Sequence, residues 1–305
     1  MKIAKTIKDL WKKIPPVYFG CFSQDAPIGS ILFFPFNYNV LRCGISAILE
    51  IKKDLKQEKL SLGSLYNKIS KIKNIDAFIN SKNSFLKEIE EETLFQDDSS
   101  FCLLAKNKEQ KEFLKKIALH LKQIIAQEES KWQSDEAKNV LINKAKDIIW
   151  RIEKEHIHNI NSIEKLAGQN IQEMGFVVIQ NFRRINSILN IIDRLEIRGR
   201  DSAGIVIAIS FSKEKFKKFE KLLLDSKLNK KYEKRKKAKD LISGSIKYNN
   251  YNNKHMASFV FKVSDEIGKL GDNVAKLSKI IKSDKLFQLA VAIGEKPFGY
   301  LSHTR

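Results

Sequence analysis

Three short segments of the chain hold the residue types that can perform chemistry. The most constrained is residues 198–204, Arg-Gly-Arg-Asp-Ser-Ala-Gly, between an apolar helix-like run and a β-branched strand-like run. Glycine permits backbone conformations and close approaches that a Cβ forbids, whereas an ordinary surface turn needs only one such residue. A helix C-cap explains Gly199 alone, so the whole run predicts a functional site. The other two segments begin at Cys43 and at His303.

Together the three segments resemble a known enzyme domain. Cys43-Gly44-Ile45, residues 198–205 and His303-Thr304-Arg305 follow the order found in the glutaminase domain of the isomerising glutamine–fructose-6-phosphate aminotransferases, or glucosamine-6-phosphate synthases. Residues 262–277 resemble the strand-then-helix segment ahead of that family's His-Thr-Arg motif. The domain is a class II glutamine amidotransferase and an N-terminal-nucleophile hydrolase. The resemblance therefore implies an α+β fold, a partial αββα sandwich with a large helical insertion.

The resemblance assigns the catalytic nucleophile to Cys43. In this family the first residue of the domain supplies a thiol that attacks the glutamine carboxamide and an α-amino group that takes the proton. An α-amine suits this role because its pKa is near 8, much closer to physiological pH than that of lysine. Arg42 precedes Cys43, which leaves two alternatives. Either residues 1–42 are removed as a propeptide, or the site lacks its amine base.

The resemblance also assigns residues that bind glutamine and shape its pocket. Arg305 matches the arginine that pairs with the α-carboxylate of glutamine, to which a planar guanidinium donates two parallel hydrogen bonds. Arg198 and Gly199 match the motif beside the nucleophile that shapes the pocket. Asp201 and Ser202 belong to the same motif, and we expect them to make structural hydrogen bonds. No cofactor or metal is implied.

The resemblance divides the chain into an N-terminal extension, residues 1–42, and a partial amidotransferase domain, residues 43–305. The resemblance does not extend to a helical block at about residues 52–175, which we expect to be an insertion. Long surface insertions cost little folding free energy when their ends stay close. The sequence stops before the family's Trp-Ala continuation. We therefore expect an N-terminal fragment, incomplete as an enzyme by itself. The whole enzyme would use L-glutamine and, through a C-terminal isomerase region, fructose 6-phosphate, and would be a homo-oligomer.

Other functions stay open. Amidophosphoribosyltransferases share Cys-Gly-Ile and a related glycine motif, although Ser202 and Thr304 favour the sugar aminotransferase. Alternatively the chain is an inactive glutaminase-like binding or regulatory module, or a basic RNA-binding helical protein. A net charge of +20, from 56 basic and 36 acidic residues, permits the last function. Because the lysines scatter along helical faces, we attribute most of the excess to compositional bias and interpret residues 227–239 as a solvated helix. A nucleic-acid partner is therefore not expected.

Composition indicates a cytoplasmic globular protein with no membrane partner. The three cysteines, Cys21, Cys43 and Cys102, are irregularly spaced, which is typical of a reducing compartment without disulfides. No run of about 18 apolar residues is present, so no transmembrane helix is expected. His156 and His158 are two residues apart, so on a helix they would face different sides, and no Cys or acid completes a metal set with them. We expect both at the surface.

Hydrophobic periodicity indicates the elements that must position these residues. Each expected helix has apolar residues every three or four positions, and each expected strand is a short β-branched run. We expect helices that include residues 113–125, 140–152, 176–195 and 265–281, one or two helices in 211–239, strands at 43–51, 205–210, 259–263 and 300–305, and a loop at 243–255.

Overall fold

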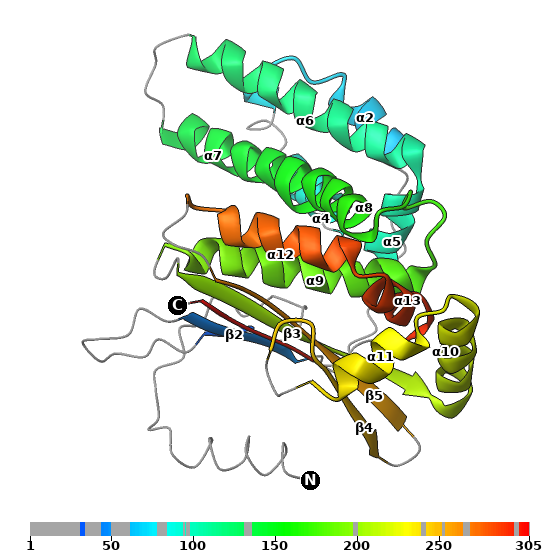
Figure 1. Ribbon diagram of the computed structural model, residues 1–305. Coiled ribbons are helices and arrows are strands. Elements are labelled where there is room, and N and C mark those ends of the chain that lie inside the picture. Colours follow the sequence, from blue (N-terminus) through cyan, green and yellow to red (C-terminus); the bar gives the residue numbers. More distant parts are fainter. Residues whose placement is uncertain are drawn as a thin grey trace.

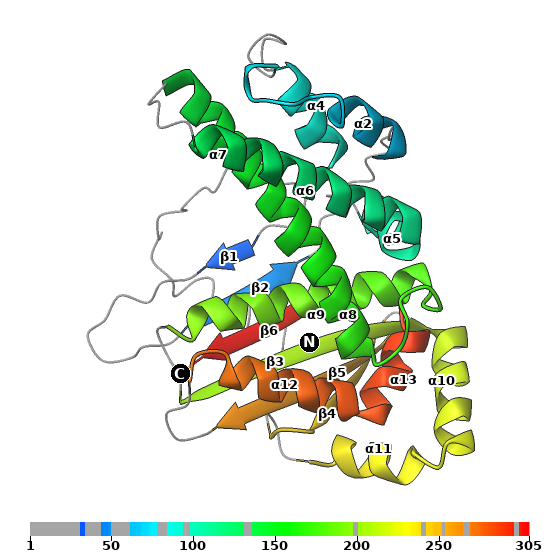
Figure 2. The ribbon, with the colours of Figure 1, turned by 90° about the horizontal axis from the view of Figure 1, so that it is seen from above.

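The computed structural model shows an α+β protein built around one antiparallel sheet. It describes residues 31–33, 44–49, 62–77, 84–93, 95, 98–130, 136–197, 201–238, 242–251, 254–264, 269–295 and 299–304. The strands in these ranges are β1 (Ile31–Phe33), β2 (Gly44–Leu49), β3 (Ser202–Ser212), β4 (Ile246–Tyr251), β5 (Lys254–Ser264) and β6 (Gly299–Thr304). Their order is β1-β2-β6-β3-β5-β4, and every neighbouring pair is antiparallel. Figure 2 shows β6 between β2 and β3, although it is the last of these strands in the chain.

One face of the sheet is apolar because alternate residues of its central strands point the same way. Along β3, Ile205 and Ile207 are at most 1% exposed. On the neighbouring β5, Phe259 and Phe261 are fully buried. Both rings meet the ring of Phe287 edge to face, at centroid distances of 5.3 and 5.2 Å, an arrangement that aromatic pairs favour. This face therefore packs against helices.

Helices cover the apolar face in successive layers. They are α2 (Leu62–Ile69), α4 (Ser84–Glu92), α5 (Asp98–Lys106), α6 (Lys108–Glu129), α7 (Glu136–Trp150), the π-helix η1 (Arg151–His158), α8 (Asn159–Ala167), α9 (Phe176–Leu195), α10 (Lys213–Asp225), α11 (Asn229–Lys236), α12 (Asp272–Ser283) and α13 (Lys285–Ile293). Figure 1 shows α9 and α12 lying across the sheet, with α6, α7 and α8 stacked beyond them. One hydrophobic core continues from the sheet through these layers.

Helix α9 is shared by the sheet and the outer helices. Its apolar residues recur every three or four positions from Ile179 to Leu195, and it contacts both β2 and β6. On the other side it packs against α8, where Nδ2 of Asn186 donates a hydrogen bond to Oδ1 of Asn159 at 2.9 Å. Burial on both sides fixes α9 firmly, and α9 leads the chain toward the Arg-Gly motif.

The structure confirms the general α+β class and most of the predicted elements. The helix predicted at residues 176–195 is α9, and the ladder within residues 113–125 lies in α6. The strands predicted near residues 205–210, 259–263 and 300–305 correspond to β3, β5 and β6. Helices α10 and α11 occupy most of the basic stretch after β3.

The predicted loop at residues 243–255 is wrong. This segment contains β4 and the beginning of β5. Ile246 of β4 is fully buried and lies opposite Phe259. Cross-strand packing of this kind outweighs the low strand preference of the neighbouring asparagines, because strand preference depends strongly on context.

Two helical expectations also need correction. Val140, the first residue of the apolar face expected for the helix at residues 140–152, is 60% exposed, because α7 instead turns Leu141, Ile142 and Ala145 inward. Helix α12 begins only at Asp272, later than expected. The residue before it, Gly271, has a φ of 92°, a conformation that favours glycine and marks the boundary.

The described elements between β2 and α9 are all helical, from α2 to α8. That this block is an insertion, and that the chain divides at residue 43, stay predictions. None of the helices in the described ranges combines the length and apolar character that crossing a bilayer requires.

Candidate functional site

Three strands bring the segments of interest to one end of the sheet. β2 begins at Gly44, β6 ends at Thr304, and β3 begins one residue before Ala203. Gly44 lies opposite Thr304 in the antiparallel register, and Thr304 lies opposite Ala203. Neighbouring strands lie about 4.8 Å apart, so these residues form a continuous row across β2, β6 and β3. Figure 2 shows these three strands side by side. We call Gly44, Thr304 and Ala203 the strand-end row.

Two predicted site residues adjoin this row along the chain. Cys43, the predicted nucleophile, immediately precedes Gly44, and Arg305, the predicted glutamine-binding residue, immediately follows Thr304. Both lie outside the described residues. The register thus brings their chain neighbours together on adjacent strands.

The glycine-containing motif approaches the same row from the third strand. Arg198 and Gly199 lie outside the described residues. Asp201 is exposed and precedes β3, while Ser202 is half-buried and lies opposite Ser264 of β5. The structural hydrogen bonding expected of Asp201 and Ser202 stays a prediction.

Glu196 joins the end of α9 to the start of α12, a contact that sequence reasoning missed. The residue is 1% exposed. Its Oε2 accepts a hydrogen bond from the Gly271 amide at 2.6 Å, and its Oε1 accepts one from the Val274 amide at 3.1 Å. Amides at a helix N-terminus lack partners within the helix and favour a negative charge. The contact therefore fixes the chain two residues before Arg198.

An open pocket of about 370 Å³ borders the strand-end row. Its lining comes from the end of β5 and from α12, namely Lys262, Val263, Ser264, Lys276, Lys279 and Ile280. Val263 lies opposite Ala203 in the sheet, which places the pocket at the same end as the row. Ammonium groups and a hydroxyl donate hydrogen bonds to anions, so the pocket suits a carboxylate or phosphate group.

Cys102 in α5 is a structural cysteine. It is fully buried, and its Sγ contacts the Phe176 carbonyl oxygen at 3.7 Å. Burial, reinforced by the negative charge of Asp98, raises the pKa of the Cys102 thiol to about 12. The thiol therefore stays protonated at physiological pH, and the thiolate is the reactive form.

We expect Cys102 to resist alkylation in the folded protein. The rise in its pKa from 9.0 to about 12 leaves about a thousandfold less thiolate near pH 8 than an unperturbed cysteine has. Iodoacetamide labelling, followed by peptide mass spectrometry, should leave the Cys102 peptide unmodified until guanidinium unfolds the chain. Equal labelling rates in the folded and unfolded protein would contradict this expectation.

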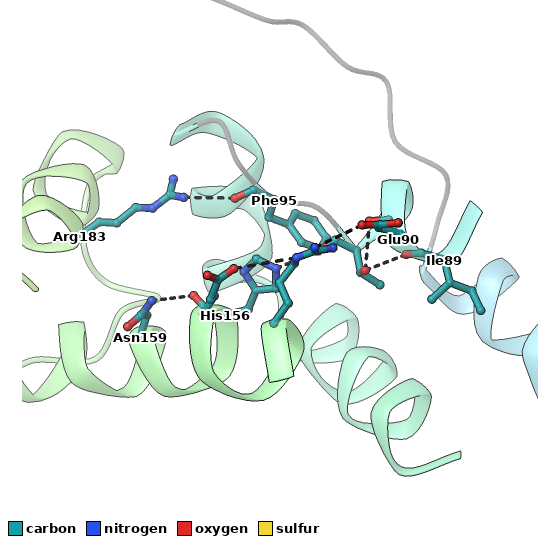
Figure 3. Close-up of polar contacts among 9 residues, drawn as sticks. Ile89, Glu90, Phe95, His156, Asn159 and Arg183 are labelled. Carbon is teal, nitrogen blue, oxygen red and sulfur yellow. Dashed lines mark hydrogen bonds and ion pairs between the residues drawn. The ribbon is translucent and has the colours of Figure 1, made fainter. Parts of the chain in front are cut away.

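A second polar cluster lies where the chain after α4 meets η1 (Figure 3). His156, expected at the surface, is only 4% exposed. Its Nε2 donates a hydrogen bond to the Thr93 carbonyl oxygen at 2.8 Å, and its ring meets Phe95 edge to face. The expectation fails because residues 93 and 95 cover this part of η1, whereas His158 is exposed as expected. Although π-helical turns often mark functional sites, the role of His156 here is to donate a hydrogen bond to a buried backbone carbonyl group.

In the part of the chain that the structure describes, no three His, Cys, Asp or Glu side chains are grouped to hold a metal ion. Comparisons with models of known protein families, with curated proteins and with solved structures give no match.

Proposed function

We propose that this chain carries the glutaminase site of an isomerising glutamine–fructose-6-phosphate aminotransferase. Cys43 is the nucleophile, Arg305 binds the α-carboxylate of glutamine, and Arg198 and Gly199 shape the pocket. The corresponding fold is an N-terminal-nucleophile hydrolase αββα sandwich. The described sheet, with α9 and α12 on one face, is compatible with one α–β half of such a sandwich.

The strand-end row is the observation that carries the proposal. A nucleophile, a carboxylate-binding arginine and a glycine-containing turn must converge to act on one glutamine molecule. Gly44, Thr304 and Ala203 come from widely separated parts of the chain, yet they lie on adjacent strands at one end of the sheet. Each is close in sequence to a proposed site residue, which supports convergence of the three motifs.

The proposed reaction has two steps. The α-amino group of Cys43 takes the thiol proton, and the thiolate attacks the carboxamide carbon of glutamine. The carbon–nitrogen bond then breaks, ammonia leaves with the proton, and a γ-glutamyl thioester remains. Water attacks the thioester, the carbon–sulfur bond breaks, and glutamate and the thiol are released. This chemistry requires that residues 1–42 be removed, because only then does Cys43 carry a free α-amino group.

The released ammonia has a proposed acceptor outside the described residues. By resemblance, an isomerase region would use it with fructose 6-phosphate to form glucosamine 6-phosphate. The glutaminase half and the acceptor half are separable parts of the proposal, and the strand-end row bears only on the first.

The glutaminase proposal is tested with protein purified from the cells that make it, treated with a diazoketone analogue of glutamine. At a reactive thiolate the diazo carbon takes a proton, a carbon–sulfur bond forms and dinitrogen leaves. We expect one adduct, on a peptide that begins at Cys43 and has a free α-amino group. Tandem mass spectrometry reads both features from the same peptide.

Substrate protection supplies the control. Excess L-glutamine should suppress the adduct, whereas D-glutamine should not, because Arg305 must meet a carboxylate in one stereochemical position. Labelling of Cys21 or Cys102 in preference to Cys43 would overturn the assignment. Protein that retains residues 1–42 and takes up no analogue would overturn it as well.

A further inference from the structure

Positive charge is concentrated on one short part of the chain. Residues 213–238, which contain α10 and α11, hold twelve basic and four acidic residues, so they carry +8 of the chain's net charge of +20. Figures 1 and 2 show both helices next to each other at one edge of the molecule, away from α6 and α7. A general bias toward lysine does not explain this concentration, because the remainder of the chain is far longer and carries only a little more net charge.

The lysines of the two helices also differ from those of the helical block in their partners. In the block, seven of the fifteen described lysines form ion pairs with acidic side chains, whereas in residues 213–238 one of the eleven lysines, Lys236, does so. The seven are Lys68, Lys87, Lys115, Lys122, Lys138, Lys144 and Lys146. On α10 and around α11, nine exposed lysines form no ion pair with any described residue. Six of them recur at helical spacing, namely Lys213, Lys217, Lys221, Lys230, Lys234 and Lys237, and the others are Lys218, Lys227 and Lys231. We call the six residues at helical spacing the basic face.

The basic face consists of two ladders. Lys213, Lys217 and Lys221 are spaced four residues apart, which places them on one side of α10. A second ladder starts at Lys230 and Lys234. Like charges at this spacing destabilise a helix slightly, so the arrangement contributes nothing to folding. Eight residues of helix extend about 12 Å, a length over which one strand of a duplex presents three to four phosphates.

The apolar sides of the two helices anchor the basic face to the core. Phe216 and Phe219 of α10 and Tyr232 of α11 are at most 7% exposed. Their rings pack together, with Phe219 and Tyr232 edge to face at a centroid distance of 5.6 Å. The aromatic side chains are therefore not available to stack on unpaired bases, which is how single strands are commonly held.

We propose that the basic face binds a nucleic-acid duplex through its phosphate backbone. A duplex presents regular phosphates and keeps its bases stacked inside, which matches a surface of unpaired lysines without exposed aromatic rings. An anionic membrane fits less well, because Leu224 is the large exposed apolar side chain found on these two helices, and peripheral binding helices insert a broad apolar face.

The test uses the full chain and a fluorescent DNA duplex of about 20 base pairs, with binding followed by anisotropy from 50 to 200 mM salt. If all six lysines contact phosphates, the logarithm of the binding constant falls with the logarithm of salt with a slope of about −5. The variant K213Q/K217Q/K221Q should bind at least about tenfold more weakly, with a slope smaller in magnitude by up to about 2.7. The variant K230Q/K234Q/K237Q should behave similarly.

A control variant with the same net charge as the two test variants distinguishes binding at the basic face from a general attraction between a positive protein and DNA. K87Q/K115Q/K146Q also removes three positive charges, but from exposed lysines that already pair with acids, and we expect it to bind like the unaltered chain. Equal weakening by all three variants would overturn the proposal. So would tighter binding to a single strand of equal length or to phosphatidylserine vesicles, and so would no binding at 50 mM salt. Circular dichroism checks that each variant remains folded.

Discussion

Replacing Arg235 by alanine is expected to lower the free energy of unfolding by about 3–5 kcal/mol. Nη1 of Arg235 contacts Oδ1 and Oδ2 of Asp284 at 2.8 and 2.6 Å, and its Nε donates a hydrogen bond to the Gly244 carbonyl oxygen. The two side chains are only 12% and 9% exposed. Alanine would therefore leave the Asp284 carboxylate buried without its cation. The midpoint of a urea transition followed by circular dichroism measures the loss.

A second variant separates the ion pair from the other role of Asp284, which caps α13 by accepting hydrogen bonds from the Leu286 and Phe287 amides. In Arg235→Met with Asp284→Asn, both charges are gone, and asparagine remains a good N-cap. This double variant should recover most of the stability, because replacing both members of a buried pair is often close to neutral. No difference between the single and double variants would contradict the assigned role.

Replacing Glu196 by alanine is expected to cost about 3 kcal/mol, because a buried carboxylate that accepts two backbone hydrogen bonds is removed. The loss should be local as well as global. The amides of Gly271 and Val274 should exchange with deuterium much faster, since they lose their acceptor. Native-state hydrogen exchange measures this change directly.

Two further variants make the Glu196 result specific. Glutamine at this position keeps one carbonyl acceptor, so Glu196→Gln should lose about half as much stability. Glu214, an acidic residue in the first turn of α10, is exposed, and its replacement by alanine should have little effect. If Glu196→Ala leaves the exchange of the first turn of α12 unchanged, the carboxylate does not hold α12. Under the glutaminase proposal, the same variant should also slow labelling of Cys43.

Elements with a strong local pattern could be predicted from the sequence. Helix α9 is an example, because its apolar residues keep a helical period for its whole length and an Arg-Gly pair follows it. β4 could not be predicted this way. Its Asn and Tyr residues resemble a loop, and only the pairing of Ile246 with Phe259 reveals a strand.

The candidate site shows a similar division. The residue types and the order of Cys43, the glycine-containing motif and Arg305 are visible in the sequence. The roles proposed for them come from the resemblance to a known family. No local pattern indicates that β6 pairs with both β2 and β3. Contacts such as Glu196 with α12, or His156 with the Thr93 carbonyl, join segments far apart in the chain. The residues that neighbour such a polar residue in the sequence do not distinguish it from a polar residue that faces water.

The position of β6 also has a consequence for how the protein is made. β6 is synthesised after the other strands of the described sheet, yet it occupies the place between β2 and β3. Until it emerges from the ribosome, β2 and β3 each keep one row of backbone amides and carbonyls unpaired, and such edges readily pair with other chains. A nascent chain that forms β2 and β3 before β6 is made would therefore have two open strand edges, and protection by chaperones would matter most at that stage.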